Sequence, residues 1–197
     1  MAMNRRSADW LRIWERKYAG TRENALHVAD GYDELTPRYF QEMAKLFLDL
    51  AGIPEKARVL DVGCGAGAFL QHLHGYRHLA GVDYAREAIQ AIRKRLPGDF
   101  RVADAAALPF EAAAFDAVLS FGVFIYFDSL GYARKVLDEM YRVLKPGGRI
   151  FIGEVNDKDK IDQYRALRVE KEADMDRKVI KNAKVDHLFF EKAFFEE

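Results

Sequence analysis

Three glycines in the stretch VLDVGCGAGAF, residues 59–69, constrain the fold of this chain more than any other feature of its sequence. The aliphatic and β-branched residues before the glycines are typical of a buried strand. Gly63, Gly65 and Gly67 follow at once, and glycine permits both a tight turn and the close approach of a ligand to the backbone. The stretch therefore predicts a strand that ends in a ligand-binding turn.

The same stretch fits two classes of ligand. Gly63, Gly65 and Ala68 satisfy the G-x-G-x-x-G/A pattern of dinucleotide-binding turns, and Asp83 lies twenty residues past Gly63, where a ribose-binding acid belongs. Asp61 favours another ligand, because a carboxylate beside the turn repels a pyrophosphate. S-adenosylmethionine (SAM) has no phosphate and carries a cationic ammonium and a cationic sulfonium. The acid therefore favours SAM over a dinucleotide.

Composition narrows the class of protein and its partners. The chain has 197 residues, half of them hydrophobic, which fits one domain with a sizeable core. Its 31 basic residues balance its 31 acidic residues, so no overall field attracts nucleic acid or an anionic membrane. We therefore expect a small-molecule partner, no nucleic acid and no membrane. The N-terminus lacks the apolar core of a signal peptide, which indicates a cytoplasmic protein.

Strands and helices alternate from Arg58 onward. Apolar runs predict strands at residues 58–62, 78–82, 99–102, 115–120 and 149–155, and helical periodicity predicts helices at about 66–74, 85–96 and 131–144. This alternation is typical of a Rossmann-like α/β fold, a doubly wound and mostly parallel sheet with helices on both faces. Three parts are expected: an N-terminal helical cap (1–57), the Rossmann-like core (58–156) and a charged helical C-terminal segment (157–197).

Polar residues follow the carboxyl ends of four predicted strands, where ligands bind on such sheets. They are Asp61, Asp83, Asp104 and Ser120. Asp83 can accept both ribose hydroxyls, and Tyr84 offers a flat apolar face to an adenine. Asp104 can accept from the exocyclic amine of adenine, with the Ala105 N–H available to a ring nitrogen. A lone acid at a strand end is more often a helix cap, but three at successive strand ends favour one shared site.

Four motifs make the chain resemble the class I SAM-dependent methyltransferases, and specifically the group with the type 11 methyltransferase domain. They are VLDVGCGAGAF, AGVDYAREAI, VADAAALPFEAAAFDAVLSFGV and LDEMYRVLKPGGRIFIGE, in this order within residues 58–156. The resemblance implies that the methionine part of SAM lies over Asp61, Gly63 and Gly65. It also implies that Ser120 and Phe121 contribute backbone near the methionine amino group, and that LKPGG is a turn before the fifth strand.

Methyl transfer depends mainly on alignment, because the sulfonium already activates the methyl carbon. A phenol, alcohol or carbon-acid acceptor would also need a general base. The candidates are His27 and Tyr32, in a segment that tends to fold over SAM in related enzymes, and Tyr126 and Asp128, which follow the strand at 115–120. Each also has a simpler explanation as a loop or packing residue. No residue set with the spacing of a metal site is found, so no metal is expected.

The leading interpretation is a SAM-dependent methyltransferase that acts on a small-molecule acceptor by in-line displacement. Two alternatives stay open: a non-catalytic SAM-binding module or regulatory partner, and a nicotinamide-dependent oxidoreductase. The chain stops at DHLFFEKAFFEE, short of the terminal antiparallel hairpin of the family, as a truncated form would. We therefore expect the edge of the strand at 149–155 to be covered by the C-terminal segment folding back or by a second subunit in a homodimer.

Overall fold

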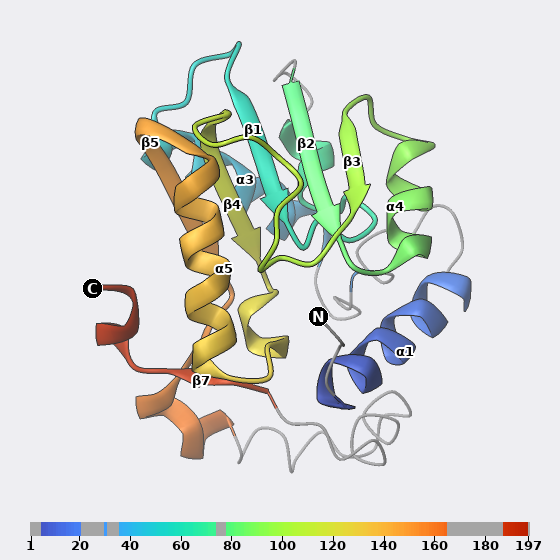
Figure 1. Ribbon diagram of the computed structural model, residues 1–197, viewed down its shortest axis with the longest axis vertical. Helices are drawn as coiled ribbons and strands as arrows, with labels where there is room; N and C mark the ends of the chain where they lie inside the picture. The colour runs from blue at the N-terminus through green and yellow to red at the C-terminus, as the bar shows by residue number, and fades with distance from the viewer. Residues whose placement is uncertain (1–4, 21–29, 31–35, 74–77, 165–186, 197) are drawn as a thin grey trace.

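The computed structural model describes residues 5–20, 30, 36–73, 78–164 and 187–196 (Figure 1). Its centre is a five-stranded sheet with the strand order β3-β2-β1-β4-β5. The strands are β1 (Arg58–Val62), β2 (His78–Asp83), β3 (Asp99–Val102), β4 (Phe115–Phe121) and β5 (Leu144–Gly153). All neighbouring strands pair in parallel, so the predicted Rossmann-like α/β class is confirmed.

Helices cover both faces of the sheet, with α5 in front and α3 behind in Figure 1. The helices are α1 (Arg5–Gly20), α3 (Pro37–Ala51), α4 (Arg86–Arg93) and α5 (Leu130–Val143), with single 3-10 turns η1 (Leu70–Leu73), η2 (Phe124–Tyr126), η3 (Lys158–Lys160) and η4 (Lys192–Phe195). Phe40, Ala44 and Phe47 of α3 are buried at helical spacing, as the apolar pattern requires. None of the described helices is long and apolar enough to cross a membrane.

Two predicted elements differ from those observed. The helix expected at 66–74 is reduced to the four residues of η1, because Gly65 and Gly67 have φ of 51° and 94°, which a right-handed helix cannot accommodate. The turn expected at LKPGG lies inside β5, which already begins at Leu144. The ladder shifts there, since Phe115 pairs with Leu144 and Ala117 with Arg149, so the segment forms a bulge.

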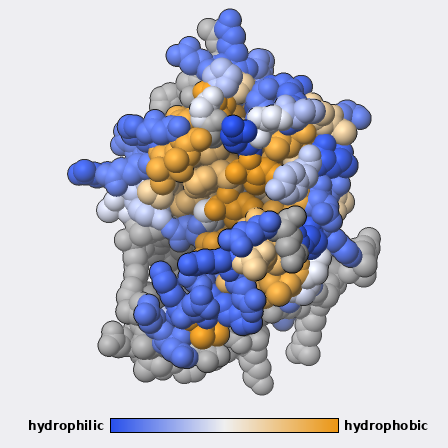
Figure 2. All heavy atoms as spheres, turned by 90° about the vertical axis from the view of Figure 1, so that its left-hand side faces the viewer, coloured by the Kyte–Doolittle hydropathy of each residue, from blue (hydrophilic) through white to orange (hydrophobic). Residues whose placement is uncertain are grey.

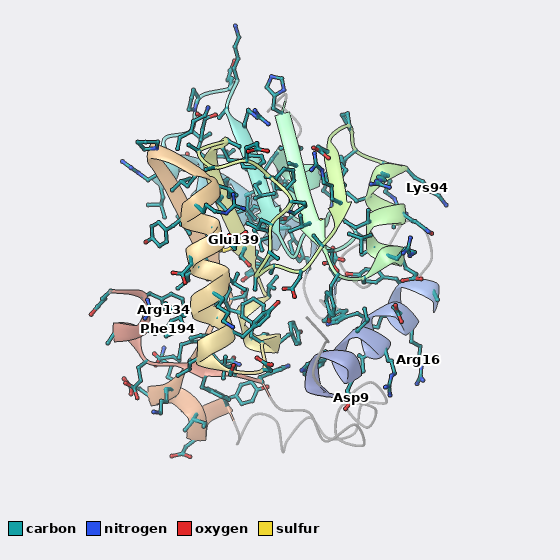
Figure 3. The ribbon with its side chains drawn as sticks, viewed as in Figure 1. Asp9, Arg16, Lys94, Arg134, Glu139 and Phe194 are labelled. Atoms are coloured by element: carbon teal, nitrogen blue, oxygen red, sulfur yellow. The ribbon has the colours of Figure 1, made fainter. Side chains whose placement is uncertain are left out.

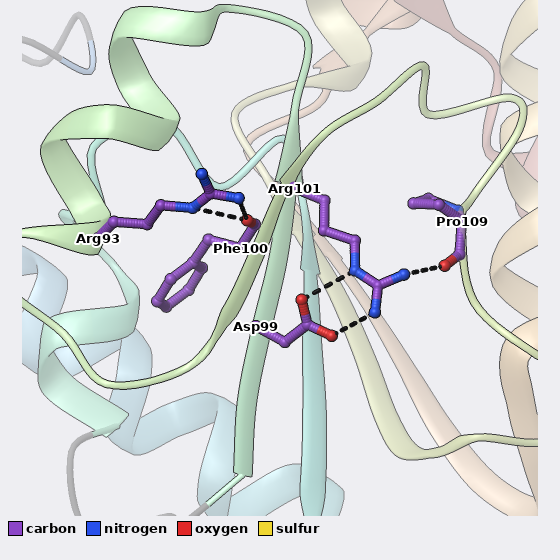
Figure 4. Close-up of polar contacts among 5 residues, drawn as sticks. All are labelled: Arg93, Asp99, Phe100, Arg101 and Pro109. Carbon is purple, nitrogen blue, oxygen red and sulfur yellow. Dashed lines mark hydrogen bonds and ion pairs between the residues drawn. The ribbon is translucent and has the colours of Figure 1, made fainter.

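The two edges of the sheet differ in chemistry. At the β3 edge, the Arg101 guanidinium binds the Asp99 carboxylate and the Pro109 carbonyl, and Arg93 donates to the Phe100 carbonyl (Figure 4). At the β5 edge, which faces the viewer in Figure 2, hydrophobic residues gather instead. The half-buried apolar side chains of β5 there are Ile150, Phe151 and Ile152. Charge protects the first edge from unwanted pairing, and the second lacks that protection.

The C-terminal segment packs on η2 and α5, and not on the edge of β5 for which it was one of the two expected covers. β7 (Phe189–Phe190) pairs with β6 (Asn156–Asp157) in a separate two-stranded sheet. Phe190 is 2% exposed and packs on Phe124 of η2, while the Phe194 ring lies 4.7 Å from the guanidinium of Arg134 on α5 (Figure 3). Within the described residues this segment therefore does not pair with β5, and the expected cover of that edge is not found there.

Candidate functional site

The carboxyl ends of β1 and β2 place two acids beside the glycine turn. Asp61 is 2% exposed and Asp83 is 8% exposed. The Gly65 N–H donates to Asp83 Oδ2 at 3.0 Å, and the Ala85 N–H donates to Oδ1 at 2.8 Å. Asp83 therefore fixes the turn after β1 and the start of α4 with one carboxylate, in addition to any contact with a ligand.

The turn itself needs glycine for two reasons. Gly63, Gly65 and Gly67 all have positive φ, between 51° and 94°, where other residues are strained. A Cβ at Gly63 would overlap the Val123 side chain, and a Cβ at Gly65 would overlap the carboxylate of Asp30. The predicted tight turn is confirmed, and side chains of the protein itself use the space beside Gly63 and Gly65. The close approach of a ligand to this backbone stays a prediction.

Asp30 is a third acid at this turn, and the sequence reasoning did not single it out. Its Oδ1 accepts from the Ala66 N–H at 2.7 Å and from the Tyr18 hydroxyl at 2.9 Å, and its Oδ2 accepts from the Ala68 N–H at 2.9 Å. The prediction took His27 and Tyr32 from the same part of the chain, and both lie outside the described residues. A loop acid before a glycine was the available signal, but local patterns do not reveal which loop reaches the turn.

Burial raises the pKa of all three acids, and a nearby positive charge would favour their ionised form. Desolvation by burial raises the pKa of Asp30 from 3.8 to about 7 and that of Asp83 to about 6, against the opposing effect of the backbone N–H donors. Burial also raises the pKa of Asp61 well above its ordinary value, and the charges of Asp30 and Asp83 add to this. Asp61 Oδ1 is buried and receives no hydrogen bond from the described residues. The oxygens of these three carboxyl groups suit a cationic ligand group.

Asp104 and Ala105 follow β3 at the same edge of the sheet. The Ala103 N–H donates to the Asp83 carbonyl at 3.0 Å, so the ends of β2 and β3 lie side by side. Asp104 is exposed, and its Oδ1 accepts from the Ala106 N–H and from the hydroxyl of Tyr132 on α5. Ala105 is half-buried in the turn that follows. The structure brings both residues near the rim of the site, and their roles stay a prediction.

Ser120 and Phe121 connect the end of β4 to the site through structural contacts. The Ser120 hydroxyl donates to the Val62 carbonyl at 2.8 Å, which ties the ends of β4 and β1 together. The Phe121 ring is 7% exposed and packs against Phe69, with 5.0 Å between ring centroids. Both side chains are therefore committed to packing, and only their backbone groups are available for the role that the family resemblance implies.

An aromatic cluster lies next to the acids. We define it as Trp10, Trp14, Tyr84, Tyr126 and His187. Tyr126 contacts Trp10, Trp14 and His187 edge to face, with ring centroids 4.7, 5.2 and 5.2 Å away. Tyr84 directly follows Asp83, and burial raises the pKa of its hydroxyl. The predicted catalytic residue Tyr126 is thus one ring of a cluster built from α1, the residue that follows β2, η2 and the C-terminal segment.

Tyr18 joins the aromatic cluster to the acids. Its ring centroid lies 6.3 Å from that of Trp14, and its hydroxyl is the one that donates to Asp30. Figure 3 shows that the exposed Arg16 of the same helix points the other way, out from the protein. The inner face of α1 therefore belongs to the site. A parallel sheet and a turn of three φ-positive glycines together define a Rossmann-like protein, and the buried acids beside the turn suit a cationic ligand.

Comparison with known proteins gives the family. Residues 60–152 match the family model described as a methyltransferase domain. The demethylmenaquinone methyltransferase of Clavibacter sepedonicus is 43% identical over 103 residues, which are 49% of this chain and 40% of that protein. The tRNA (carboxymethyluridine(34)-5-O)-methyltransferase of Arabidopsis thaliana is 30% identical over 125 residues, which are 61% of this chain and 30% of that protein.

A solved structure supports the fold. The complex of the Haloferax volcanii Trm112 methyltransferase activator with a methyltransferase has a TM-score of 0.68 and 22% identity, and the match covers 93% of this chain and 72% of that one. Residues 60–152 therefore carry a methyltransferase domain, and the fold is that of the class I methyltransferases, whose cofactor is SAM. This outcome decides against the nicotinamide alternative.

One expectation about partners is wrong. Balanced charge was taken to exclude nucleic acid, but several relatives are named as tRNA methyltransferases. Net charge over a whole chain does not report the charge of the surface that binds a substrate, nor of segments that relatives add outside the shared domain. The matched region is less than half the length of the two relatives described above, so their complete activities are not properties of this chain by similarity.

Proposed function

We propose that the chain transfers the methyl group of SAM to a planar small-molecule acceptor by in-line displacement. When bound, SAM supplies a methyl carbon that its sulfonium activates toward a nucleophile. The observation that carries the proposal is the aromatic cluster beside the buried acids, joined to them by Tyr18 and by the sequence neighbours Asp83 and Tyr84. The flat faces of such a cluster suit a conjugated ring.

The proposed cofactor contacts follow from the three buried acids. Asp61 and its oxygen without a hydrogen bond would face the positive charges of SAM, with Gly63 and Gly65 allowing close backbone approach. Asp83 would accept from the ribose hydroxyls with the lone pairs that its two backbone N–H bonds leave. The other proposed contacts are those of Tyr84, Asp104 and Ala105 with adenine, and of the Ser120 and Phe121 backbone with the methionine end.

The proposed acceptor contacts come from the aromatic cluster. The Trp10 Nε1–H is buried and has no hydrogen-bond partner among the described residues. It can therefore donate a hydrogen bond to an oxygen of the molecule that receives the methyl group. Tyr126 stays our candidate for the residue that takes a proton from the acceptor, and His27 and Tyr32 stay candidates outside the described residues. A general base at such a position accelerates the reaction by about 10² to 10⁴-fold.

A nucleotide of tRNA is the second candidate acceptor. The relative from Arabidopsis thaliana and others named as tRNA methyltransferases favour it. A base splayed out of a loop is also a planar ring and stacks on aromatic side chains. The cluster therefore fits both acceptors. The small molecule is favoured by the relative from Clavibacter sepedonicus, which is named as a demethylmenaquinone methyltransferase and is 43% identical over 103 residues. The cytoplasmic location predicted from the sequence stays a proposal as well.

Methyl-release assays with SAM separate the candidates. We expect turnover with members of a library of phenols, quinols and aromatic amines, and a loss of about tenfold or more in kcat/KM for Trp14→Ala because the acceptor loses a stacking face. Turnover with tRNA alone would contradict the small-molecule proposal. Binding of SAM by calorimetry without turnover on any acceptor would instead support the non-catalytic SAM-binding module.

A further inference from the structure

Every backbone N–H of the glycine turn already has a partner within the protein. The N–H groups of Gly63 and Cys64 both donate to the Val82 carbonyl, and that of Gly67 donates to the Cys64 carbonyl. The Gly65 N–H donates to Asp83 Oδ2. The N–H groups of Ala66 and Ala68 donate to Oδ1 and Oδ2 of Asp30. Successive N–H groups in such turns form concave sites for anions, and dinucleotide-binding proteins use them to hold a pyrophosphate. In this protein the anion at the turn is a carboxylate of the same chain.

Asp30 occupies this position as a built-in ligand. Each of its oxygens accepts one N–H of the turn, from Ala66 at 2.7 Å and from Ala68 at 2.9 Å. The residue lies 36 positions before Ala66 and outside the strand–turn–strand unit to which the glycines belong. Its carboxylate is buried, which raises its pKa to about 7, so at pH 8 it is ionised in this position.

Tyr18 and Gly65 allow Asp30 to occupy this position. The Tyr18 hydroxyl on α1 donates to Oδ1 at 2.9 Å. A Cβ at position 65 would overlap both the Asp30 carboxylate and the Tyr18 hydroxyl, so Gly65 leaves the room that this contact needs. Asp61 and Asp83 add their charges to the same site. An incoming phosphate would therefore have to displace a buried anion that accepts three hydrogen bonds, and would meet two further acids.

We propose that Asp30 determines which class of cofactor the site accepts, because its carboxylate fills the anion-binding position of the glycine turn and so rejects phosphate-bearing cofactors in favour of a cationic one. The glycine pattern that this chain shares with dinucleotide-binding turns then no longer selects a dinucleotide. Asp30 adds to the discrimination that Asp61 provides, through direct occupation of the N–H groups and not only through charge.

The test compares wild type, Asp30→Ala and Tyr18→Phe by calorimetry at pH 8 with inorganic pyrophosphate and SAM as probes. For Asp30→Ala we expect pyrophosphate to bind at least about tenfold tighter than to wild type, because two N–H groups lose their anion, and SAM to bind about tenfold weaker, because one charge is lost. Tyr18→Phe retains the carboxylate and should exclude pyrophosphate as wild type does. Circular dichroism and thermal melting confirm that each variant is folded.

Several results would overturn the proposal. One is a folded Asp30→Ala variant that binds pyrophosphate and SAM as wild type does. Another is an equal gain in pyrophosphate binding by Tyr18→Phe, which would trace the effect to a loosened α1. Hydrogen exchange on cofactor-free wild type decides the matter if Asp30→Ala does not fold. Protected Ala66 and Ala68 amides are expected there, and exchange at the rate of an open turn would show that Asp30 does not occupy them.

Discussion

The carboxylate of Asp61 sits at the end of β1 with one buried oxygen that receives no hydrogen bond from the described residues. We predict that Asp61→Asn raises the melting temperature of the cofactor-free protein, because folding then no longer buries a carboxyl group whose ionisation is opposed by desolvation and by two nearby acids. The same change should weaken SAM binding by about tenfold, since the cofactor loses a counter-charge. Thermal melting and calorimetry measure the two effects. A lower melting temperature together with unchanged SAM affinity would contradict this role.

The matched control for Asp61 is Asp104→Asn. Asp104 also follows a strand of the sheet, but it is exposed and its Oδ1 is held by Ala106 and Tyr132. We expect its effect on the free energy of unfolding to stay within about 1 kcal/mol, because solvent already screens this charge. A gain in stability as large as that of Asp61→Asn would show that any acid removed from this edge has the same effect.

The raised pKa values of the site acids predict an unusual dependence of stability on pH. Between the ordinary value of 3.8 and about 7, folded Asp30 binds a proton that the unfolded chain has already lost. Folded Asp83 does the same up to about 6. The folded state then binds more protons, so the free energy of unfolding of the cofactor-free protein should fall as pH rises through this window. SAM affinity should rise over the same window, as the acids ionise.

Thermal melting measures how stability changes from about pH 5 to about pH 8, and calorimetry measures how SAM affinity changes over the same range. Stability should fall and SAM affinity should rise. Asp99, Asp116 and Glu139 have lowered pKa values and contribute the opposite trend, but only in more acidic solution. Asp30→Asn should flatten the decline in stability. A melting temperature that rises with pH across the window would mean that the site acids are not buried as charges in the folded protein.

Residues at the strand ends were predictable and Asp30 was not. Asp61 and Asp83 follow apolar runs in the sequence, and parallel strands bring such residues to one edge. Asp30 reaches the turn through the tertiary packing of α1 and Tyr18, for which the sequence has no periodic signal. Tyr126 was a candidate because of its place after β4, yet its partners Trp10 and His187 come from opposite ends of the chain.

Two glycines, one in a helix and one in a strand, predict opposite effects of substitution by alanine. Gly131 lies in α5, and a Cβ there would meet nothing within 4 Å. Gly131→Ala should therefore stabilise the protein by about 0.5–1 kcal/mol, because the unfolded chain loses backbone freedom. In Gly81→Ala the new Cβ would overlap Cys64, and we expect a loss of about 1–3 kcal/mol. Urea denaturation measures both. Equal effects of the two changes would contradict this packing.

Two phenylalanines test how the C-terminal segment docks. Phe190 in β7 is 2% exposed and packs on Phe124, whereas Phe195 in η4 is 37% exposed. Phe190→Ala should lower the free energy of unfolding by about 3–5 kcal/mol, because it leaves a cavity in the core. Phe195→Ala should cost about 1.5 kcal/mol or less. If urea denaturation finds no cost for Phe190→Ala, the segment does not add to the core of the folded protein.

The sequence predicted strands and helices correctly where the regular spacing of apolar residues was unbroken. β1 and β3 begin and end where the sequence indicated, since each has a run of strand-forming residues bounded by turns. The expected helix at 66–74 failed because its glycines have positive φ, a conformation that periodicity does not report. β5 began earlier than expected, since a bulge lets the LKPGG segment join the ladder.

At the scale of the whole molecule, the sequence predicted a parallel α/β sheet and its family but not the assembly around it. The boundaries 58 and 156 of the core stay a prediction, and residues 165–186 of the charged C-terminal segment lie outside the described residues. The methyl acceptor was not predictable either, because the aromatic cluster draws on four separate parts of the chain. Its members come together only through long-range packing, which local sequence patterns do not encode.

The strand order also governs how the chain folds. β1 lies between β2 and β4, and the contact that closes its far side joins Val62 to Ser120, 58 residues later. Parallel pairing over such separations requires large loops to close first, and proteins dominated by non-local pairings fold in about milliseconds to seconds, far more slowly than helical bundles. Asp30, Asp61 and Asp83 all precede β4 in the sequence. Their mutual repulsion therefore acts before β4 has paired with the free edge of β1. We therefore expect the pairing of β4 with β1, and not the formation of the helices, to limit the refolding rate of this protein.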